Sequence, residues 1–398
     1  MYNVAVEAEN YYNKGTKYLN AKNYLKALSF FKKQLKTHSF KELHLNMGNA
    51  HRMLGEISLA GQHYTLACES SVPFADGSFG EYALGLNNLG LHIFASGDDV
   101  LSRALYLRAL DLDPKYGEAY WNLGIATLRA NNCNTREGWD LYEYRFDRGP
   151  GSVAIARDVP WWDFATTGDS IVVMTEQGLG DKIQFARYLP YLSGYFKEVS
   201  VVCDSSLDMF YSGYNCIRSV PADSLAVPLC SLPRAFGVVP ETSGWLDNIS
   251  AYKFDSGFNI GVVFTGSKTH SNDFNRSCPV YLAKKLAGLG RLYGLNPADP
   301  KLHGVTPLNP KTWAETVAYV KGLDVVVSVD TSIVHLAASL RKPVIMMQPK
   351  RETDFRWGNP FSGSQSWYSS LHIVQNPNNW ETTVNNVREM LLHANNLT

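Results

Sequence analysis

The chain has 398 residues, 45% of them hydrophobic, and 37 basic side chains stand against 37 acidic ones. This length predicts two or three domains, each large enough for its own hydrophobic core. The formal charge of zero argues against nucleic acid or an anionic membrane surface as the main partner.

The sequence shows neither a signal-peptide pattern nor an apolar run long enough to span a bilayer, and its six cysteines form no C-x-x-C pair. We therefore expect free thiols and a cytoplasmic location.

Residues 8–145 carry an internal repeat. Its glycines follow helical stretches at spacings of 33, 42 and 34 residues: Gly15, Gly48, Gly90 and Gly124. The first two glycines are followed about twelve residues later by Ala27 and Ala60. An aromatic residue follows each of these alanines by four residues, namely Phe31 and Tyr64. Tyr106 takes the same place in the third unit. The pattern resembles the tetratricopeptide repeat, a unit of two antiparallel helices.

The repeats predict a helical domain over residues 1–150, with an insertion near 70–82 and a drifting fourth unit that caps the array. Such an array binds peptides or other helices more often than it catalyses a reaction. A role only in spacing or dimerising the chain stays open. We interpret the acidic residues at 111–113 as the tail of a repeat helix before Pro114, and not as metal ligands.

From about Val159 short β-rich runs alternate with helical stretches. The predicted strands are Ile171–Thr175, Val199–Cys203, Asn259–Thr265, Arg291–Leu295, Val325–Val329 and Val344–Met347. The predicted helices are Gln184–Leu192, Val280–Leu289, Thr312–Gly322 and Ile333–Leu340. This order predicts two parallel sheets with helices on both faces. Prolines and glycines at 231–255 indicate the linker, so we predict domains at 151–250 and 251–398.

Three polar segments follow predicted strands, where ligands of parallel sheets bind. In "TEQGLGDKIQFARY" (175–188), two glycines allow close backbone approach before Asp181, which either caps a helix or takes part in chemistry. In "VVFTGSKTHSNDFNRS" (262–277), hydroxyls, a glycine amide and two cations suit phosphate oxygens, although a solvated loop has a similar composition. In "VVVSVDTSIVHLAASL" (325–340), a helix begins directly after a buried strand, so its amides and its dipole suit a diphosphate.

With these segments placed, the chain resembles tetratricopeptide-repeat glycosyltransferases. Its catalytic half is similar to the heptosyltransferases and, more distantly, to the protein O-N-acetylglucosamine transferases. The matching stretches are "EQGLGDKIQFARYLP", "PLCSLPRAFG", "GVVFTGSKTHSNDFNRS" and "DVVVSVDTSIVHLAASLRKPV", with weaker ones at "PWWD" and "DFRW". The resemblance implies the GT-B fold, in which two Rossmann-like domains face each other across a cleft. The acceptor side would be residues 151–250, and the sugar nucleotide would bind mainly to residues 251–398.

The resemblance also implies the reaction and its residues. A sugar would pass from a nucleotide-diphosphate sugar to an acceptor hydroxyl, without a metal or a further cofactor and with inversion. Asp181 would be the general base, and Arg276 and His335 would act on the leaving diphosphate. The implied donor-binding residues are Gly180, Thr265, Gly266, Ser267, Lys268, Asn296, Asp330, Thr331 and Ser332. Asp299 is the candidate for an acidic contact to the ribose.

The repeats favour a protein or peptide acceptor, and self-association into a homo-oligomer stays open. Two other functions remain open as well: transfer to a saccharide or lipid-linked acceptor, and a scaffold whose transferase-like half is inactive. A nicotinamide dehydrogenase is disfavoured because "GLGRLYG" (288–294) leads into a strand instead of following one. The aromatic residues Trp357, Trp367 and Tyr368 are weaker candidates for the base or sugar pocket.

Overall fold

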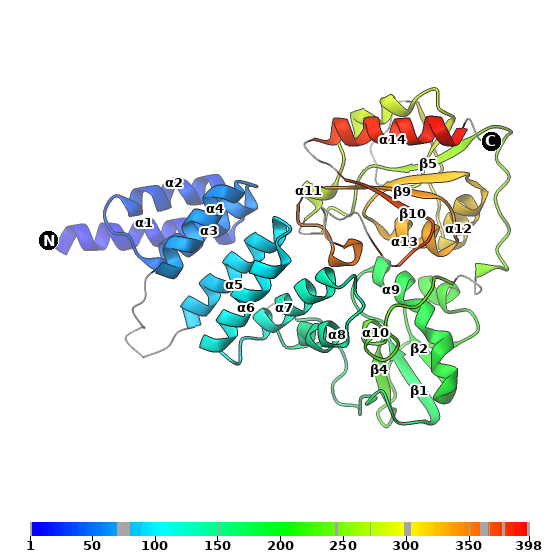
Figure 1. Ribbon diagram of the computed structural model, residues 1–398, viewed down its shortest axis with the longest axis horizontal. Helices are drawn as coiled ribbons and strands as arrows, with labels where there is room; N and C mark the ends of the chain where they lie inside the picture. The colour runs from blue at the N-terminus through cyan, green and yellow to red at the C-terminus, as the bar shows by residue number, and fades with distance from the viewer. Residues whose placement is uncertain are drawn as a thin grey trace. The chain divides into compact units, whose positions relative to one another are not determined.

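The structure is a computed structural model (Figure 1). It describes residues 2–69, 80–149, 152–242, 246–270, 272–297, 304–349, 351–358, 365, 367–375 and 379–395. The chain forms two compact units. The first contains residues 1–130 and 140–152, and the second contains residues 131–139 and 153–398. The predicted domain limits at 150 and 250 stay predictions.

The first unit is a series of helix pairs, coloured blue to cyan in Figure 1. Its helices are α1 (Tyr2–Asn20), α2 (Tyr24–Leu35), α3 (Lys41–Met53), α4 (Ile57–Glu69), α5 (Gly80–Ala95), α6 (Asp99–Leu112) and α7 (Gly117–Ala130). The shorter α8 (Arg136–Tyr142) and the 3-10 helix η1 (Glu143–Phe146) follow. The predicted repeat array is confirmed, and the predicted insertion falls mostly on residues 70–79, outside the described residues.

The repeat glycines are explained by the aromatic rings that pack on them. A Cβ atom added to Gly48 would lie 2.5 Å from the ring of Tyr64, and one added to Gly90 would lie 2.5 Å from the ring of Tyr106. Gly15 and Phe31 are placed in the same way. The first helix of each pair therefore lies close to the second because the glycine leaves room for a buried ring.

The second unit contains two wholly parallel sheets, as predicted. The first has the order β3-β2-β1-β4, and its strands are β1 (Gly168–Met174), β2 (Phe196–Val202), β3 (Asn215–Ile217) and β4 (Ala226–Pro228). Between these strands run α9 (Leu179–Phe185) and the 3-10 helices η2 (Ala186–Gly194) and η3 (Ser205–Tyr211). The 3-10 helix η4 (Leu229–Ser231) and the short helix α10 (Pro233–Phe236) follow β4.

The second sheet has the order β10-β9-β8-β5-β6-β7. Its strands are β5 (Asn259–Val263), β6 (Arg291–Gly294), β7 (Val305–Pro307), β8 (Val325–Val329), β9 (Val344–Gln348) and β10 (Leu371–Gln375). Its helices are α11 (Asp273–Arg276), η6 (Val280–Leu286), α12 (Trp313–Gly322), α13 (Ser332–Ser339), η7 (Phe355–Trp357) and α14 (Trp380–Asn395). The apolar face of α14 shares a core with the central strands, where Val384, Val387 and Leu391 are buried (Figure 1).

The predicted fold class, a helical repeat array followed by a GT-B type α/β region, is confirmed. Each predicted strand coincides with an observed one to within a few residues. Two of the predicted helices are mostly 3-10 helices: Val280–Leu289 contains η6, which begins directly after Pro279, and Gln184–Leu192 passes from the end of α9 into η2. In the part of the chain that the structure describes, no helix is long and apolar enough to cross a bilayer. The described cysteines Cys133, Cys203, Cys216, Cys230 and Cys278 are free thiols, as predicted.

Candidate active site

The candidate site lies where strands β1, β5 and β8 end. Because parallel strands present their carboxyl ends at one edge, the residues that follow them converge. The loop after β5 brings Thr265, Gly266 and Ser267, and the turn after β8 brings Asp330 and Thr331. Helix α9, which follows β1, supplies its first turn from the other sheet.

Two cavities occupy this region of the second unit. The larger, of about 990 Å³, extends from the β5 loop to Asn296 and to the start of α12 at Trp313. The smaller, of about 630 Å³, extends from the first turn of α9 to Arg356. Ser267, Thr269, Thr331 and Ser332 line both cavities, so the two adjoin.

The twelve residues predicted for catalysis and for donor binding line one cavity or the other. The larger cavity contains Thr265, Gly266, Ser267, Lys268, Asn296, Thr331 and Ser332. The smaller contains Gly180, Asp181, Ser267, Arg276, Asp330, Thr331, Ser332 and His335. The structure thus brings together residues from positions 180 to 335, which the sequence placed on three separate segments. Asp299 lies outside the described residues.

Arg276 is held against the backbone of the β5 loop. Its Nη1 donates to the carbonyl oxygen of Asp330 over 3.2 Å. A Cβ atom added to Gly266 would lie 2.6 Å from Nε and from Nη2 of Arg276. The guanidinium therefore occupies space that only a glycine at 266 leaves free, between the two segments predicted to hold phosphates.

The start of α13 has no side-chain cap among the described residues. Thr331 stands at the N-cap position, but its hydroxyl makes no capping bond and lies 3.1 Å from the hydroxyl of Ser328 instead. A threonine at this position commonly caps the helix through its hydroxyl, and here that bond is not formed. The first backbone N–H groups of the helix remain available to an anion in the cavity.

Asp181 is fixed from two sides. Its Oδ2 accepts a hydrogen bond of 2.9 Å from the backbone N–H of Gly178, and its Oδ1 pairs with Arg356. The second branch of the Arg356 guanidinium donates to Asp354 over 2.7 Å. Burial raises the pKa of Asp181, and the charge of Arg356 opposes that rise. Asp181 therefore caps α9, as one reading of the sequence expected, and it also lines the smaller cavity.

His335 is buried and packs on α9. A Cβ atom added to Gly180 would lie 2.8 Å from Cδ2 of the His335 ring. The Nδ1 atom of His335 lies 2.9 Å from the hydroxyl of Tyr368. Burial first, and then the charges of Arg356 and Arg187, lower the pKa of His335 well below its usual value. The imidazole is therefore neutral near pH 7, and it contributes a hydrogen bond instead of a positive charge.

Asp330 carries a perturbed carboxyl. Burial first, and then the neighbouring carboxylate of Asp354, raise the pKa of Asp330 to about 6. A carboxylate near a diphosphate would repel it, so a raised pKa at this position lessens the repulsion. The residue therefore titrates in the range where enzymes commonly work.

Sequence reasoning missed several residues of the smaller cavity. Gln348 ends β9, and Thr353, Asp354 and Arg356 follow it, and their importance depends on contacts with residues far away in the chain. The carboxamide of Gln348 and the hydroxyl of Thr353 are buried and make no hydrogen bond with any residue that the structure describes. The only signal in the sequence was the weak "DFRW" match.

The three aromatic residues proposed for the base or sugar pocket are buried in packing contacts. Trp357 stacks on His335 with ring centroids 5.1 Å apart, and Trp367 lies edge-on to Trp139 at 6.3 Å. The carbonyl oxygen of Trp367 accepts a hydrogen bond of 2.7 Å from Arg187. None of the three is among the described residues that line either cavity.

Residues 292–385 match the family model described as glycosyltransferase family 9 (heptosyltransferase). The chain carries a glycosyltransferase domain. The predicted resemblance and the predicted enzyme class are thereby confirmed. No curated protein matches the chain closely enough to count as a relative.

Solved structures that resemble the chain fall into two groups. The E. coli heptosyltransferase WaaC with ADP is 14% identical, covers 56% of this chain and 99% of its own, and gives a TM-score of 0.41. A Thermobaculum terrenum O-GlcNAc transferase mutant is 13% identical over 98% of this chain and 90% of its own, with a TM-score of 0.38. YrrB, a TPR protein with an unusual peptide-binding site, is 19% identical over 36% of this chain and 69% of its own, with a TM-score of 0.29.

Proposed function

We propose that the glycosyltransferase domain moves a sugar from a nucleotide-diphosphate sugar to a hydroxyl group of a protein or peptide that the repeats recruit. We propose further that the transfer needs no metal and inverts the anomeric centre. The observation that carries the proposal is the pair of adjoining cavities, since they share the residues predicted to face a diphosphate. The predicted cytoplasmic location and the open question of self-association stay predictions.

The cavities suggest how the donor is oriented. The larger one, beside Asn296 and Trp313, is lined largely by uncharged and aliphatic groups and suits a nucleoside. The shared residues Thr331 and Ser332, together with Arg276, suit the two phosphates. The sugar then enters the smaller cavity, where Asp181 lies.

The charges of the site support a displacement at the anomeric carbon. As the bond to the nucleotide breaks, negative charge grows on the diphosphate, and Arg276 with the N-terminal amides of α13 would stabilise it. Asp181 would take the proton from the attacking hydroxyl, and Arg356 would hold the carboxylate in place. A neutral His335 would add a hydrogen bond, provided that the Tyr368 hydroxyl donates to Nδ1 and leaves the proton on Nε2.

The buried polar groups of the smaller cavity support a sugar as its ligand. The Gln348 carboxamide offers both donors and an acceptor, and the Thr353 hydroxyl offers one of each. Leaving such groups without partners costs about 1–3 kcal/mol each, so a ligand with several hydroxyl groups would recover that cost. A sugar is such a ligand.

The first unit supports an extended peptide as the acceptor. An asparagine precedes every repeat glycine by two residues, and these are Asn13, Asn46, Asn88 and Asn122. Their amides meet side chains of neighbouring helices: Asn46 donates to Tyr12 over 2.9 Å, and Asn122 donates to Asn87 over 2.8 Å. A regular row of carboxamides can bond the N–H and C=O groups of a peptide whatever its sequence.

Binding and transfer test the proposal in turn. Thermal shifts of the full chain are measured with UDP-, GDP-, ADP-, CMP- and TDP-linked sugars, for the wild type and for Arg276→Ala. A ligand at 100 times its dissociation constant should add about 2.7 kcal/mol of stability, and the variant should lose the shift. Absence of a shift with every donor would favour the inactive scaffold.

The identified donor is then offered with peptide and with saccharide acceptors. Asn46→Ala combined with Asn88→Ala should raise the KM for a peptide acceptor and leave donor binding unchanged. Gln62→Ala, an exposed residue of α4, serves as the matched control. Transfer to saccharides alone, with no effect of the asparagine variants, would instead support the saccharide transferase.

A further inference from the structure

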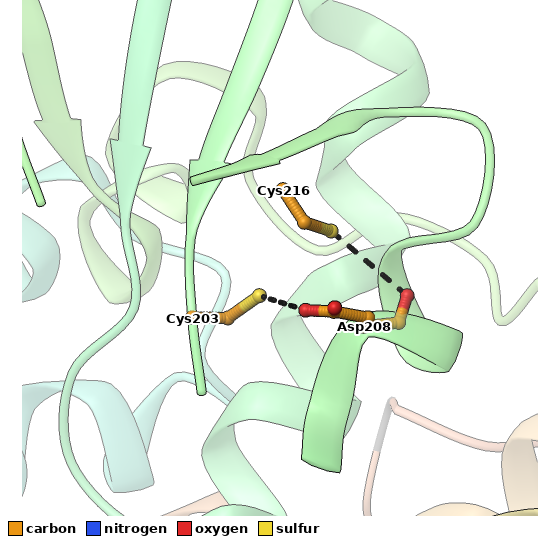
Figure 2. Close-up of side chains that lie close together, drawn as sticks. All are labelled: Cys203, Asp208 and Cys216. Atoms are coloured by element: carbon orange, nitrogen blue, oxygen red, sulfur yellow. Dashed lines mark hydrogen bonds between the residues drawn. The ribbon is translucent and has the colours of Figure 1, made fainter. Parts of the chain in front are cut away.

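A second cluster of reactive side chains lies outside the two cavities, on the first sheet (Figure 2). Cys203 directly follows β2, Cys216 lies in β3, and Asp208 belongs to η3, the 3-10 helix between those strands. One ligand atom from each residue lies within 4.8 Å of the others. The Cys203 thiol donates to Oδ1 of Asp208 over 3.3 Å, and the Cys216 thiol donates to the carbonyl oxygen of Asp208 over 3.9 Å.

We propose that Cys203, Asp208 and Cys216 bind one zinc-class divalent ion. Two thiolates and a carboxylate form a donor set that Zn²⁺ prefers over harder cations. Bond lengths of about 2.3 Å to sulfur and about 2.1 Å to oxygen make a sulfur–oxygen edge of about 3.6 Å in a tetrahedron. The observed distance of 3.3 Å between Sγ of Cys203 and Oδ1 of Asp208 is close to that edge. The Cys216 sulfur lies within 4.8 Å of both atoms, so it would move inward to complete the site.

Arg218 completes the surroundings of the site. Its Nη1 and Nη2 bind the two oxygens of Asp208 over 2.7 and 2.5 Å, and Nη1 also donates to the carbonyl oxygen of Cys203 over 2.9 Å. An ion on Oδ1 would share that oxygen with Nη1, while Nη2 holds Oδ2, and Nη1 also lies 3.8 Å from Sγ of Cys203. A hydrogen bond to a carboxylate that binds a metal commonly orients it. Two thiolates and one carboxylate carry three negative charges, which a divalent cation and the guanidinium balance.

The site also leaves a position for a fourth ligand. The Asp208 side chain is 40% exposed, and Cys216 is half-buried, so a water molecule can complete a tetrahedron from the solvent side. A cysteine binds a metal as its thiolate, so the ion displaces two protons as it binds.

The position of η3 shows what the ion would do. The same 3-10 helix lines the larger cavity through Ser205, Ser206 and Met209, and its Phe210 ring meets Trp313 at 5.5 Å. An ion on Asp208 would tie η3 to the ends of β2 and β3, and so fix one wall of the nucleotide cavity. This role is structural, and it leaves the proposed transfer chemistry without a metal.

Metal titration of the full chain tests the proposal. The protein is stripped with a chelator, kept reduced with a phosphine, and titrated with Zn²⁺ against a chromophoric chelator and separately with Co²⁺. We expect one Zn²⁺ per chain and a thiolate-to-cobalt charge-transfer band. Cys216→Ser should weaken Zn²⁺ binding roughly 100-fold and diminish the band, whereas Cys278→Ala, which removes a thiol from the core of the second sheet, should change neither.

Two results would overturn the proposal. One is a folded wild-type protein that binds no stoichiometric Zn²⁺, and the other is a Cys216→Ser variant that binds it as tightly as the wild type. Cys216 is chosen because it is half-buried, and its replacement by serine disturbs the fold less than replacement of the buried Cys203. Asp208→Asn gives a second, thiol-independent comparison, since an amide is a poorer zinc ligand than a carboxylate.

Discussion

Arg356 binds Asp181 across the cleft, although 175 residues separate them in the chain. Asp181 lies in the first turn of α9 beside the first sheet, and Arg356 lies in η7, between strands β9 and β10 of the second sheet. Both side chains are largely buried, with 16% and 8% of their surfaces exposed. The charge state of the proposed general base therefore depends on a residue contributed by the other half of the domain.

Replacing Arg356 should shift the pH dependence of transfer. The pKa of Asp181 is already raised by burial, and removing the cation that opposes the rise should raise it further. In Arg356→Met the acid limb of kcat/KM should move to higher pH, while at high pH the rate should partly recover. Arg356→Lys keeps the charge and is the control. An acid limb that does not move in the methionine variant would remove Asp181 from the role of base.

Gly266→Ala should weaken donor binding without unfolding the protein. The new methyl group would displace the Arg276 guanidinium from its place on the β5 loop. We expect a loss of about 10-fold or more in nucleotide-sugar affinity, corresponding to one weakened charge-assisted contact. Isothermal titration measures it. Gly194→Ala is the matched control, because a Cβ atom there would meet nothing within 4 Å; equal losses in both variants would contradict the assigned role of Arg276.

Asp330→Asn should flatten part of the pH dependence of stability. The folded pKa of Asp330, about 6, lies above the unfolded value of about 3.9, so the native state holds this proton more tightly. Its contribution to the free energy of unfolding is present below about pH 4 and is lost as the pH rises through about 6. Denaturation at pH 4.5 and at pH 7.5 should show that the free energy of unfolding falls less between these two pH values in the variant than in the wild type. An identical decline would mean that Asp330 ionises normally.

Gly48→Ala should destabilise the repeat unit by about 1–3 kcal/mol, because the methyl group would overlap the buried ring of Tyr64. Tyr64→Leu removes the ring and its overlap, although it leaves a cavity. The double variant should therefore lose less than the sum of the two single losses. Urea denaturation of the three variants measures the coupling, and strictly additive losses would show that the glycine is not needed for the ring.

The repeat array was predictable because its signals are local and periodic. Glycine, alanine and aromatic residues return at fixed intervals, and the structure shows the glycine and the ring in direct contact. The ends of β1, β5 and β8 were predictable for a similar reason. A buried apolar strand must end at polar residues, and parallel strands end at the same edge.

The contacts that cross the cleft could not be predicted in this way. Gln348 ends β9 and Arg356 follows in a segment whose composition is that of an ordinary loop, and only the fold brings them beside Asp181 and Asp330. The same holds for Cys203 and Cys216. Their separation of thirteen residues matches no metal motif, and they meet because β2 and β3 are neighbours. The 3-10 geometry of η6 was missed because its apolar spacing also fits an α-helix.

The described residues between 353 and 369 belong to the second sheet by sequence, yet several of them bind the first. Arg356 pairs with Asp181, and the carbonyl oxygen of Trp367 accepts from Arg187. Two other residues of the same stretch, Trp357 and Tyr368, contact His335 of α13 beside the second sheet. The described residues of this stretch therefore fasten the two halves to each other inside the active site, so any opening of the cleft would have to break contacts that also position Asp181 and His335.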